Sequence, residues 1–112
     1  MKSSPKLTKE QIDPYFLKWN HLSIQINDMH KLRNKAVKEV TQSGIEVYKK
    51  LLAHCRCALD EESFEPLNGA ERLLFIEFSL STYAAYRQLD ELFSELKKII
   101  ARKRIEHKHL NK

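Results

Sequence analysis

The chain has 112 residues, enough for one domain or for one half of an oligomeric core. Hydrophobic residues make up 42% and charged residues 31%, and with two Gly and three Pro this composition favours long helices and excludes a disordered chain. No apolar run approaches the ~18 residues of a membrane span, and the first residues, MKSSPKLTKEQ, lack the apolar stretch of a secretory signal. We therefore expect a helix-rich protein of the cytoplasm.

The first 13 residues are expected to form a flexible N-terminal segment. Thr8 and Gln11 have the spacing of a capping box, which predicts one short turn. Asp13 and Pro14 give a stronger start signal, because Asp is a good N-cap and Pro fits the first helical position. The first long helix is therefore predicted over residues 14–59.

An apolar stripe runs through residues 14–59 without a clear stop. Arg33 interrupts it, and Gly44 is its one weak position, since Gly costs ~1 kcal/mol relative to Ala inside a helix. Gly44 marks either a kink or a tight helix crossing. The spacings are sums of three and four, as a helix requires, in the stripe Trp19, Leu22, Ile26, Met29, Ala36, Val40, Val47 and Leu51.

An acidic loop, DEESFEPLN, is predicted over residues 60–68, with Phe64 and Leu67 pinning it to the body. Asn68 and Glu71 have the positions of an N-cap and a capping-box Glu, so a second helix is predicted over residues 69–106. A second apolar line, Leu73, Ile76, Leu80 and Tyr83, widens its apolar face. The main seam alternates steps of four and three: Phe75, Ser79, Thr82, Tyr86, Leu89, Phe93, Leu96 and Ile100.

Two long helices with a short connection pack as antiparallel neighbours. The predicted fold class is therefore all-α, a long antiparallel helical hairpin that forms a single helical domain over residues 14–106. Such a hairpin cannot bury broad apolar stripes on both helices by itself. Either it self-associates into a coiled-coil-like homo-oligomer, which we prefer, or the chain bends at Gly44 into a compact three- or four-helix bundle.

Cys55 and Cys57 form a C-x-C pair beside His54, the kind of grouping that binds metals. On a helix, however, positions i and i+2 point in different directions, so the two thiols can neither share a metal nor form an easy disulfide. We expect two small, buried or half-buried residues, and no metal or cofactor.

The net basicity of the chain lies in its last sixteen residues. Residues 97–112 hold seven Lys or Arg and one Glu, and residues 107–112 form a basic tail. Lys and Arg near a helix C-terminus oppose the negative end of the helix dipole. They also predict salt-sensitive, non-specific nucleic-acid contact, with Arg102, Lys103 and Arg104 as the anion contacts.

The tail segment RKRIEH also resembles the R-x4-H element of the HEPN family, all-α domains that include dimeric ribonucleases. The resemblance implies that Arg102 would stabilise the scissile phosphate and that His107 would transfer a proton. A HEPN-type ribonuclease is therefore an alternative function.

Residues 19–98 are similar in layout to the phasin family, which coats polyhydroxyalkanoate granules. The similarity lies in WNHLSIQINDMHKL and AVKEVTQSGIEVYKKLLAH, in the acidic break, and in SLSTYAAYRQLDELFSELKK. It implies a non-enzymatic protein that adsorbs to a granule surface through apolar helix faces. The physics of an interfacial helix fits LLFIEFSL, and the expected apolar contacts are Leu73, Leu74, Phe75, Phe78 and Phe93. A small protein-binding adaptor bundle is the third alternative.

Overall fold

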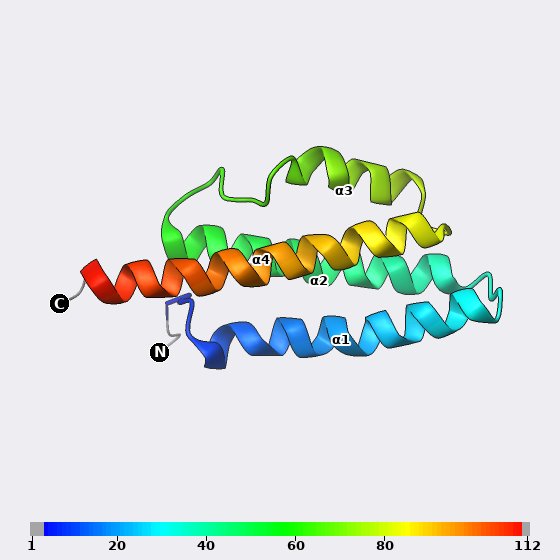
Figure 1. Cartoon of the computed structure of the whole chain (residues 1–112), viewed down its shortest axis with the longest axis horizontal. Helices are drawn as coiled ribbons and strands as arrows, with labels where there is room; N and C mark the ends of the chain where they lie inside the picture. The colour runs from blue at the N-terminus through cyan, green and yellow to red at the C-terminus, as the bar shows by residue number, and fades with distance from the viewer. Residues whose placement is uncertain (1–3, 111–112) are drawn as a thin grey trace.

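The computed structural model describes residues 4–110, with side chains to residue 106, and this part of the chain contains helices and no strand. The helices are α1 (Lys9–Lys31), α2 (Val37–Leu59), α3 (Gly69–Phe78) and α4 (Tyr83–Leu110). Successive helices are antiparallel, and the short α3 lies over α2 and α4 (Figure 1). The molecule measures 52 × 27 × 23 Å. The predicted all-α fold class is confirmed.

The prediction of two long helices is wrong, because a tight turn divides each of them. Residues 32–36 separate α1 from α2, and residues 79–82 separate α3 from α4. The chain therefore forms the compact bundle that was the alternative to the hairpin. The main reason for expecting self-association is weakened, since one chain buries most of its own apolar stripes.

The turn between α1 and α2 depends on two polar residues. Arg33 adopts the left-handed conformation, with φ of 53°, and this ends α1. The backbone N–H of Asn34 donates to the carbonyl of Met29 at 2.9 Å. The side-chain oxygen of Asn34 accepts from the N–H of Ala36, also at 2.9 Å. Asn34 thus closes one helix and opens the next.

The turn between α3 and α4 is closed by the hydroxyl group of Thr82. The Thr82 side chain accepts a hydrogen bond from the N–H of Ala85 at 3.1 Å, as an N-cap does. Its hydroxyl also donates to the carbonyl of Ser79 at 2.8 Å. These two bonds satisfy backbone groups that a continuous helix would pair internally, so the chain can reverse here.

Helix α1 begins earlier than predicted. Thr8 is its N-cap, and the Thr8 side chain accepts from the N–H of Gln11 at 3.4 Å. Pro14 therefore lies inside the helix and does not start it. The reason is burial, because Leu7 and Ile12 are 9% and 1% exposed and hold the first turn against the core. Of residues 4–8, which were expected to be flexible, Leu7 is buried and the other four are exposed.

Gly44 marks a tight helix crossing and not a kink, since α2 continues through it. A Cβ atom at Gly44 would lie 2.7 Å from Cζ3 of Trp19 and 3.1 Å from Cδ2 of Leu89. Both distances are shorter than ordinary carbon–carbon contact. Only glycine lets α2 approach the indole this closely.

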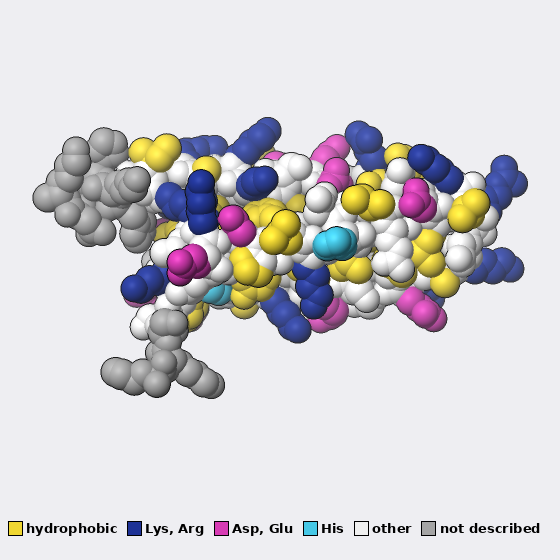
Figure 2. All heavy atoms as spheres, turned by 90° about the horizontal axis from the view of Figure 1, so that it is seen from below, with side chains coloured by type: hydrophobic (Ala, Val, Ile, Leu, Met, Phe, Trp, Pro, Cys, Tyr) yellow, Lys and Arg dark blue, Asp and Glu magenta, His cyan; other side chains and the backbone are white. Residues whose placement is uncertain are grey.

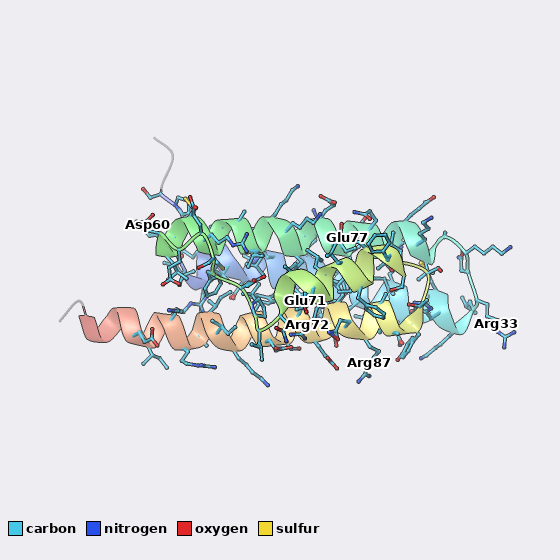
Figure 3. All side chains as sticks on the ribbon, turned by 90° about the horizontal axis from the view of Figure 1, so that it is seen from above. Arg33, Asp60, Glu71, Arg72, Glu77 and Arg87 are labelled. Atoms are coloured by element: carbon cyan, nitrogen blue, oxygen red, sulfur yellow. The ribbon has the colours of Figure 1, made fainter. Side chains whose placement is uncertain are left out.

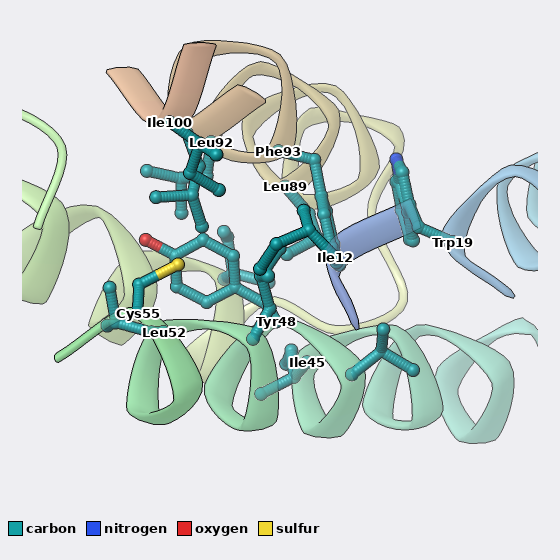
Figure 4. Packing of buried hydrophobic residues seen from close by; sticks show 14 of the residues in the cluster. Ile12, Trp19, Ile45, Tyr48, Leu52, Cys55, Leu89, Leu92, Phe93 and Ile100 are labelled. Carbon is teal, nitrogen blue, oxygen red and sulfur yellow. The ribbon is translucent and has the colours of Figure 1, made fainter. Parts of the chain in front are cut away.

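The core lies between α1, α2 and α4 and is centred on aromatic rings (Figure 4). Trp19 stacks on Phe93 with ring centroids 4.5 Å apart, and Tyr48 meets Phe93 edge-on at 5.4 Å. The indole N–H of Trp19 donates to Asp90 at 3.1 Å, so the buried ring keeps a polar partner. On either side of Phe93 along α4, the core contains Leu89, Leu92, Leu96 and Ile100.

Within residues 4–110, no helix has the length and apolar character that crossing a membrane requires.

Candidate functional site

Helix α3 is fastened to α4 through Arg72. The guanidinium group donates to both carboxylate oxygens of Glu95, to one of them at 3.0 Å, and to the carbonyl of Leu67 at 3.0 Å. Glu91 lies 3.9 Å away and adds a second carboxylate. The hydrogen bond from Arg72 lowers the pKa of Glu95, so the pair is ionised at neutral pH.

Three further contacts hold α3 and the preceding loop. Ile76 is fully buried under α3, and Lys49 of α2 pairs with Glu77 at 3.3 Å. Phe64 is 6% exposed, and its carbonyl accepts from Nε of Arg56 at 2.9 Å. The prediction that Phe64 pins the loop is confirmed. α3 is therefore a fixed element whose outward side chains have defined positions (Figure 3).

The outward side of α3 exposes large apolar side chains. Phe78 is 86% exposed and Leu74 is 54% exposed, and both project away from the buried Ile76. Phe75 is 48% exposed, and Leu67, one residue before the N-cap, is 79% exposed. We call these four residues the α3 surface. Leu67 was expected to pin the loop, and that prediction is wrong.

The five residues predicted for apolar contact divide into three groups. Leu74, Phe75 and Phe78 are exposed, as a contact surface requires, while Leu73 is half-buried against the core. Phe93 is 1% exposed and stacked on Trp19, so its prediction as a surface contact is wrong. The predicted seam joined Phe75 to Phe93 through a continuous helix, whereas the 79–82 turn separates α3, where Phe75 is exposed, from α4, where Phe93 faces the core.

A hollow of about 310 Å³ lies between α2 and α3, beside the α3 surface. Ala70, one turn before Leu74, lines it together with Leu52, Ala53 and Leu73. Glu65 stands at its edge, and a Cβ atom on Gly69 would lie 2.8 Å from an Oε atom of Glu65. The apolar ridge of α3 is thus bordered by a depression.

The start of α3 does not use the predicted capping box. Asn68 occupies the N-cap position but has φ of 55° and makes no side-chain capping hydrogen bond. An Asn in this left-handed conformation does not present its side chain to the N–H groups of the first turn as an extended N-cap does. Glu71 is consequently left exposed on the outward side of α3.

The opposite face of the molecule, along α1, looks different. Figure 2 shows hydrophobic side chains interspersed there with Lys, Arg, Asp and Glu. Leu17 and Ile24 are 62% and 59% exposed. A groove of about 460 Å³ between α1 and α4 has Phe16, Trp19 and Phe93 in its wall. Its aromatic residues are already paired with one another.

The predicted anion contacts on α4 are mostly occupied. Arg102 is exposed, but Lys103 pairs with Glu61 at 3.5 Å and with Glu106 at 3.8 Å. Nε of Arg104 donates to the backbone carbonyl of Leu7, which ties the N-terminal segment to α4. α4 continues past residue 106, the predicted helix end, to Leu110. The side chain of His107, the second residue of the R-x4-H element, and residues 111–112 lie outside the described part.

The N-terminal segment is also held by α2. Nε2 of His54 lies 2.8 Å from the carbonyl of Lys6, and Nδ1 lies 3.3 Å from the hydroxyl of Tyr15. The neutral imidazole satisfies both partners by donating from Nε2 and accepting at Nδ1. His54 therefore has a structural role beside Cys55.

The two thiols should react at very different rates. Cys55 is fully buried, and burial raises its pKa to about 12, whereas Cys57 is exposed. At mildly alkaline pH, one thiol per folded chain should react with a disulfide reagent, and the second should react only in denaturant. Cys57→Ser should remove the fast reaction and Cys55→Ser should keep it. Equal rates for the two thiols would contradict this burial.

Among the described residues, no group of three or more His, Cys, Asp or Glu side chains is placed to hold a metal ion.

Comparison with known proteins identifies a family. The family model described as YpoC-like protein matches residues 9–108, nearly the whole helical bundle. No curated protein and no solved structure matches the chain.

The resemblance to phasins is therefore wrong, because YpoC-like proteins are a distinct family. The layout of long amphipathic helices and an acidic break, on which that resemblance rested, is common to many helical proteins. The chain belongs to the YpoC-like protein family.

Proposed function

We propose that this protein is a non-enzymatic adaptor that binds a partner protein on the α3 surface. The observation that carries the proposal is the 86% exposure of Phe78 on a helix that the Arg72–Glu95 pair holds in place. A large exposed apolar side chain is unfavourable in water unless a partner covers it. Aromatic residues in such positions supply much of the binding energy of protein interfaces.

The rigidity of α3 supports a docking role. Lys49 and Arg72 attach it from two sides, so its outward residues are positioned before a partner arrives. A preformed surface loses little conformational entropy on binding. The hollow beside Ala70 gives a partner side chain a place to insert.

A nucleic-acid function draws less support from the structure. Lys103 and Arg104, two of the three anticipated anion contacts, are already engaged by Glu61 and by the Leu7 carbonyl. Non-specific binding strengthens with each free cation that reaches a phosphate. Arg102 alone among these three is exposed and outside the salt bridges of the described residues.

Site-specific photo-crosslinking tests the proposal. A benzophenone amino acid at position 78 should give one discrete protein adduct in cells, because the side chain faces the partner. The same amino acid at Leu32, which is 79% exposed in the α1–α2 turn, is the matched control and should give none. The protein in the adduct is then identified, purified and titrated by calorimetry.

In that titration, Phe78→Asp should weaken binding by about thirtyfold or more, which corresponds to a loss of ~2 kcal/mol. Leu32→Asp should leave the affinity unchanged. Identical adducts from positions 78 and 32, or a titration indifferent to Phe78→Asp, would rule out the α3 surface as the docking site.

A further inference from the structure

The shape of the α3 surface favours a helical partner. Leu74 and Phe78 lie one turn apart along α3, so these two exposed apolar side chains follow one line along the helix. The hollow lined by Leu52, Ala53 and Ala70 runs beside this line. A ridge beside a groove is the geometry that receives a second helix. The described residues contain no strand edge that an extended peptide could join.

The charge around the α3 surface is negative. Residues 60–78 contain six carboxylates and one arginine. Glu61 and Glu77 are paired with Lys103 and Lys49. The other four, Asp60, Glu62, Glu65 and Glu71, are all exposed and make no salt bridge within residues 4–106. Of these, Glu71 lies on α3 and Glu65 lines the hollow, whereas Asp60 lies at the end of α2, away from α3 (Figure 3).

The nearby cations compensate only part of this negative charge. Arg72 is shared between Glu91 and Glu95, and Lys49 is taken by Glu77. Arg56 donates to the carbonyl of Phe64, and Arg87 of α4 is exposed. Glu71 lies on the outward side of α3 with Leu74 and Phe78, so any occupant of the ridge meets its carboxylate.

We infer that the partner segment is a basic amphipathic helix, with an apolar stripe for Leu74 and Phe78 and with Lys or Arg flanks for Glu65 and Glu71. This inference rests on the proposed docking function and names the chemistry of its partner. Complementary charge at the rim accelerates association and selects the partner, while the apolar stripe supplies affinity.

The same charge argues against other occupants. In a symmetric contact between two copies, Glu71 of one would face the acidic surface of the other. The four apolar residues also expose on the order of 400 Å² together, about half of what each partner buries in a standard interface. Anionic lipid headgroups and nucleic-acid phosphates would be repelled.

The experiment uses the full chain and two fluorescent peptides of about five helical turns. Both peptides carry the same Leu and Ala stripe, one with Lys and the other with Glu on its polar face, and their helicity is matched by circular dichroism. Fluorescence anisotropy should show binding of the Lys peptide and none of the Glu peptide. Raising the salt concentration should weaken the Lys complex, because rim charges are screened.

Variants distinguish peptide binding at the α3 surface from non-specific binding elsewhere on the protein. Phe78→Asp should abolish binding of the Lys peptide, since it removes the anchor, and Glu65→Lys/Glu71→Lys should weaken binding at least tenfold. Asp28→Lys changes an exposed carboxylate on α1 and should have no effect. Equal losses from the Asp28 and Glu71 variants would mean non-specific attraction and would overturn the inference.

The failures of the two proposals are distinguishable by mapping the segment crosslinked to position 78. If position 78 crosslinks to a partner, but to a segment that is acidic or not helical, the basic-helix inference fails and the docking function stands. Tighter binding of the Glu peptide would have the same meaning. If position 78 gives no specific adduct and neither peptide binds, both proposals fail.

Discussion

Phe93→Ala should lower the free energy of unfolding by about 3–5 kcal/mol. Phe93 is 1% exposed and contacts Trp19, Tyr48 and Phe16, whose ring lies edge-on at 6.3 Å. Its truncation removes buried apolar area and leaves a cavity between α1, α2 and α4. Urea denaturation followed by circular dichroism should show a lower midpoint with an unchanged slope.

Phe78→Ala is the matched control, with the same change in chemistry on the outside of α3. Because Phe78 is 86% exposed, the free energy of unfolding should change by less than about 0.5 kcal/mol. Similar losses from the two variants would mean that Phe78 is buried in solution, and the α3 surface would then not be free to bind.

Gly44→Ala should destabilise the protein by about 1–3 kcal/mol, although the same change ordinarily stabilises a helix by ~1 kcal/mol. The new Cβ would lie 2.7 Å from the Trp19 ring. That ring cannot move away because it is stacked on Phe93 and hydrogen-bonded to Asp90. Thermal unfolding of the purified variant measures the effect.

Ser43→Ala is the control for Gly44→Ala, one residue earlier and exposed. Among the described residues, the Ser43 hydroxyl donates only to the carbonyl of Glu39 in its own helix, at 3.3 Å, so a small gain or no change in stability is expected. If Gly44→Ala raises the melting temperature as much as Ser43→Ala does, the close crossing of α2 over Trp19 is incorrect.

Helical periodicity predicted the helices and much of the core but not their ends. Leu89, Phe93, Leu96 and Ile100 stood on one predicted seam, and all four are buried. A stripe with a period near 3.6 reports which side is apolar, and it continues across a turn if the helices on both sides face the same core. The stripe from Trp19 to Leu51 therefore hid the break at residues 32–36.

The signals for the breaks were present but weak. Asn34 follows the Arg33 that interrupts the stripe. Asn favours turns because its side chain accepts a hydrogen bond from the backbone N–H two residues further on, here that of Ala36. Thr82 is a good N-cap, but it was counted as a small residue of the seam. Such short polar residues occur inside helices as well. Whether one of them caps a helix end depends on which backbone N–H and carbonyl groups the tertiary structure leaves without a helical partner.

The candidate site was partly predictable from the pattern of apolar residues. LLFIEFSL contains more apolar residues than one helix side can bury, and this placed Leu74, Phe75 and Phe78 at a surface. The seam predicted Phe93 as a contact because the sequence shows no clear break between Phe75 and Phe93. Leu67 was assigned to the interior because a loop needs an anchor, whereas Phe64 and the Arg72 contact to the Leu67 carbonyl supply that anchor.

Trp19 is the only tryptophan of the chain, and it lies where α1 meets α4. Its ring also packs against Gly44 of α2, so its fluorescence reports on the junction of α1, α2 and α4, while far-ultraviolet circular dichroism reports on all helices together. α1 and α2 are neighbours in sequence, whereas the Trp19–Asp90 bond closes a loop of 71 residues, and contacts of long sequence separation form slowly. In a rapid-mixing experiment the circular dichroism signal would precede the tryptophan signal when α4 docks on a preformed α1–α2 pair. Trp19 is thus an intrinsic fluorescence probe for the step in which the core closes.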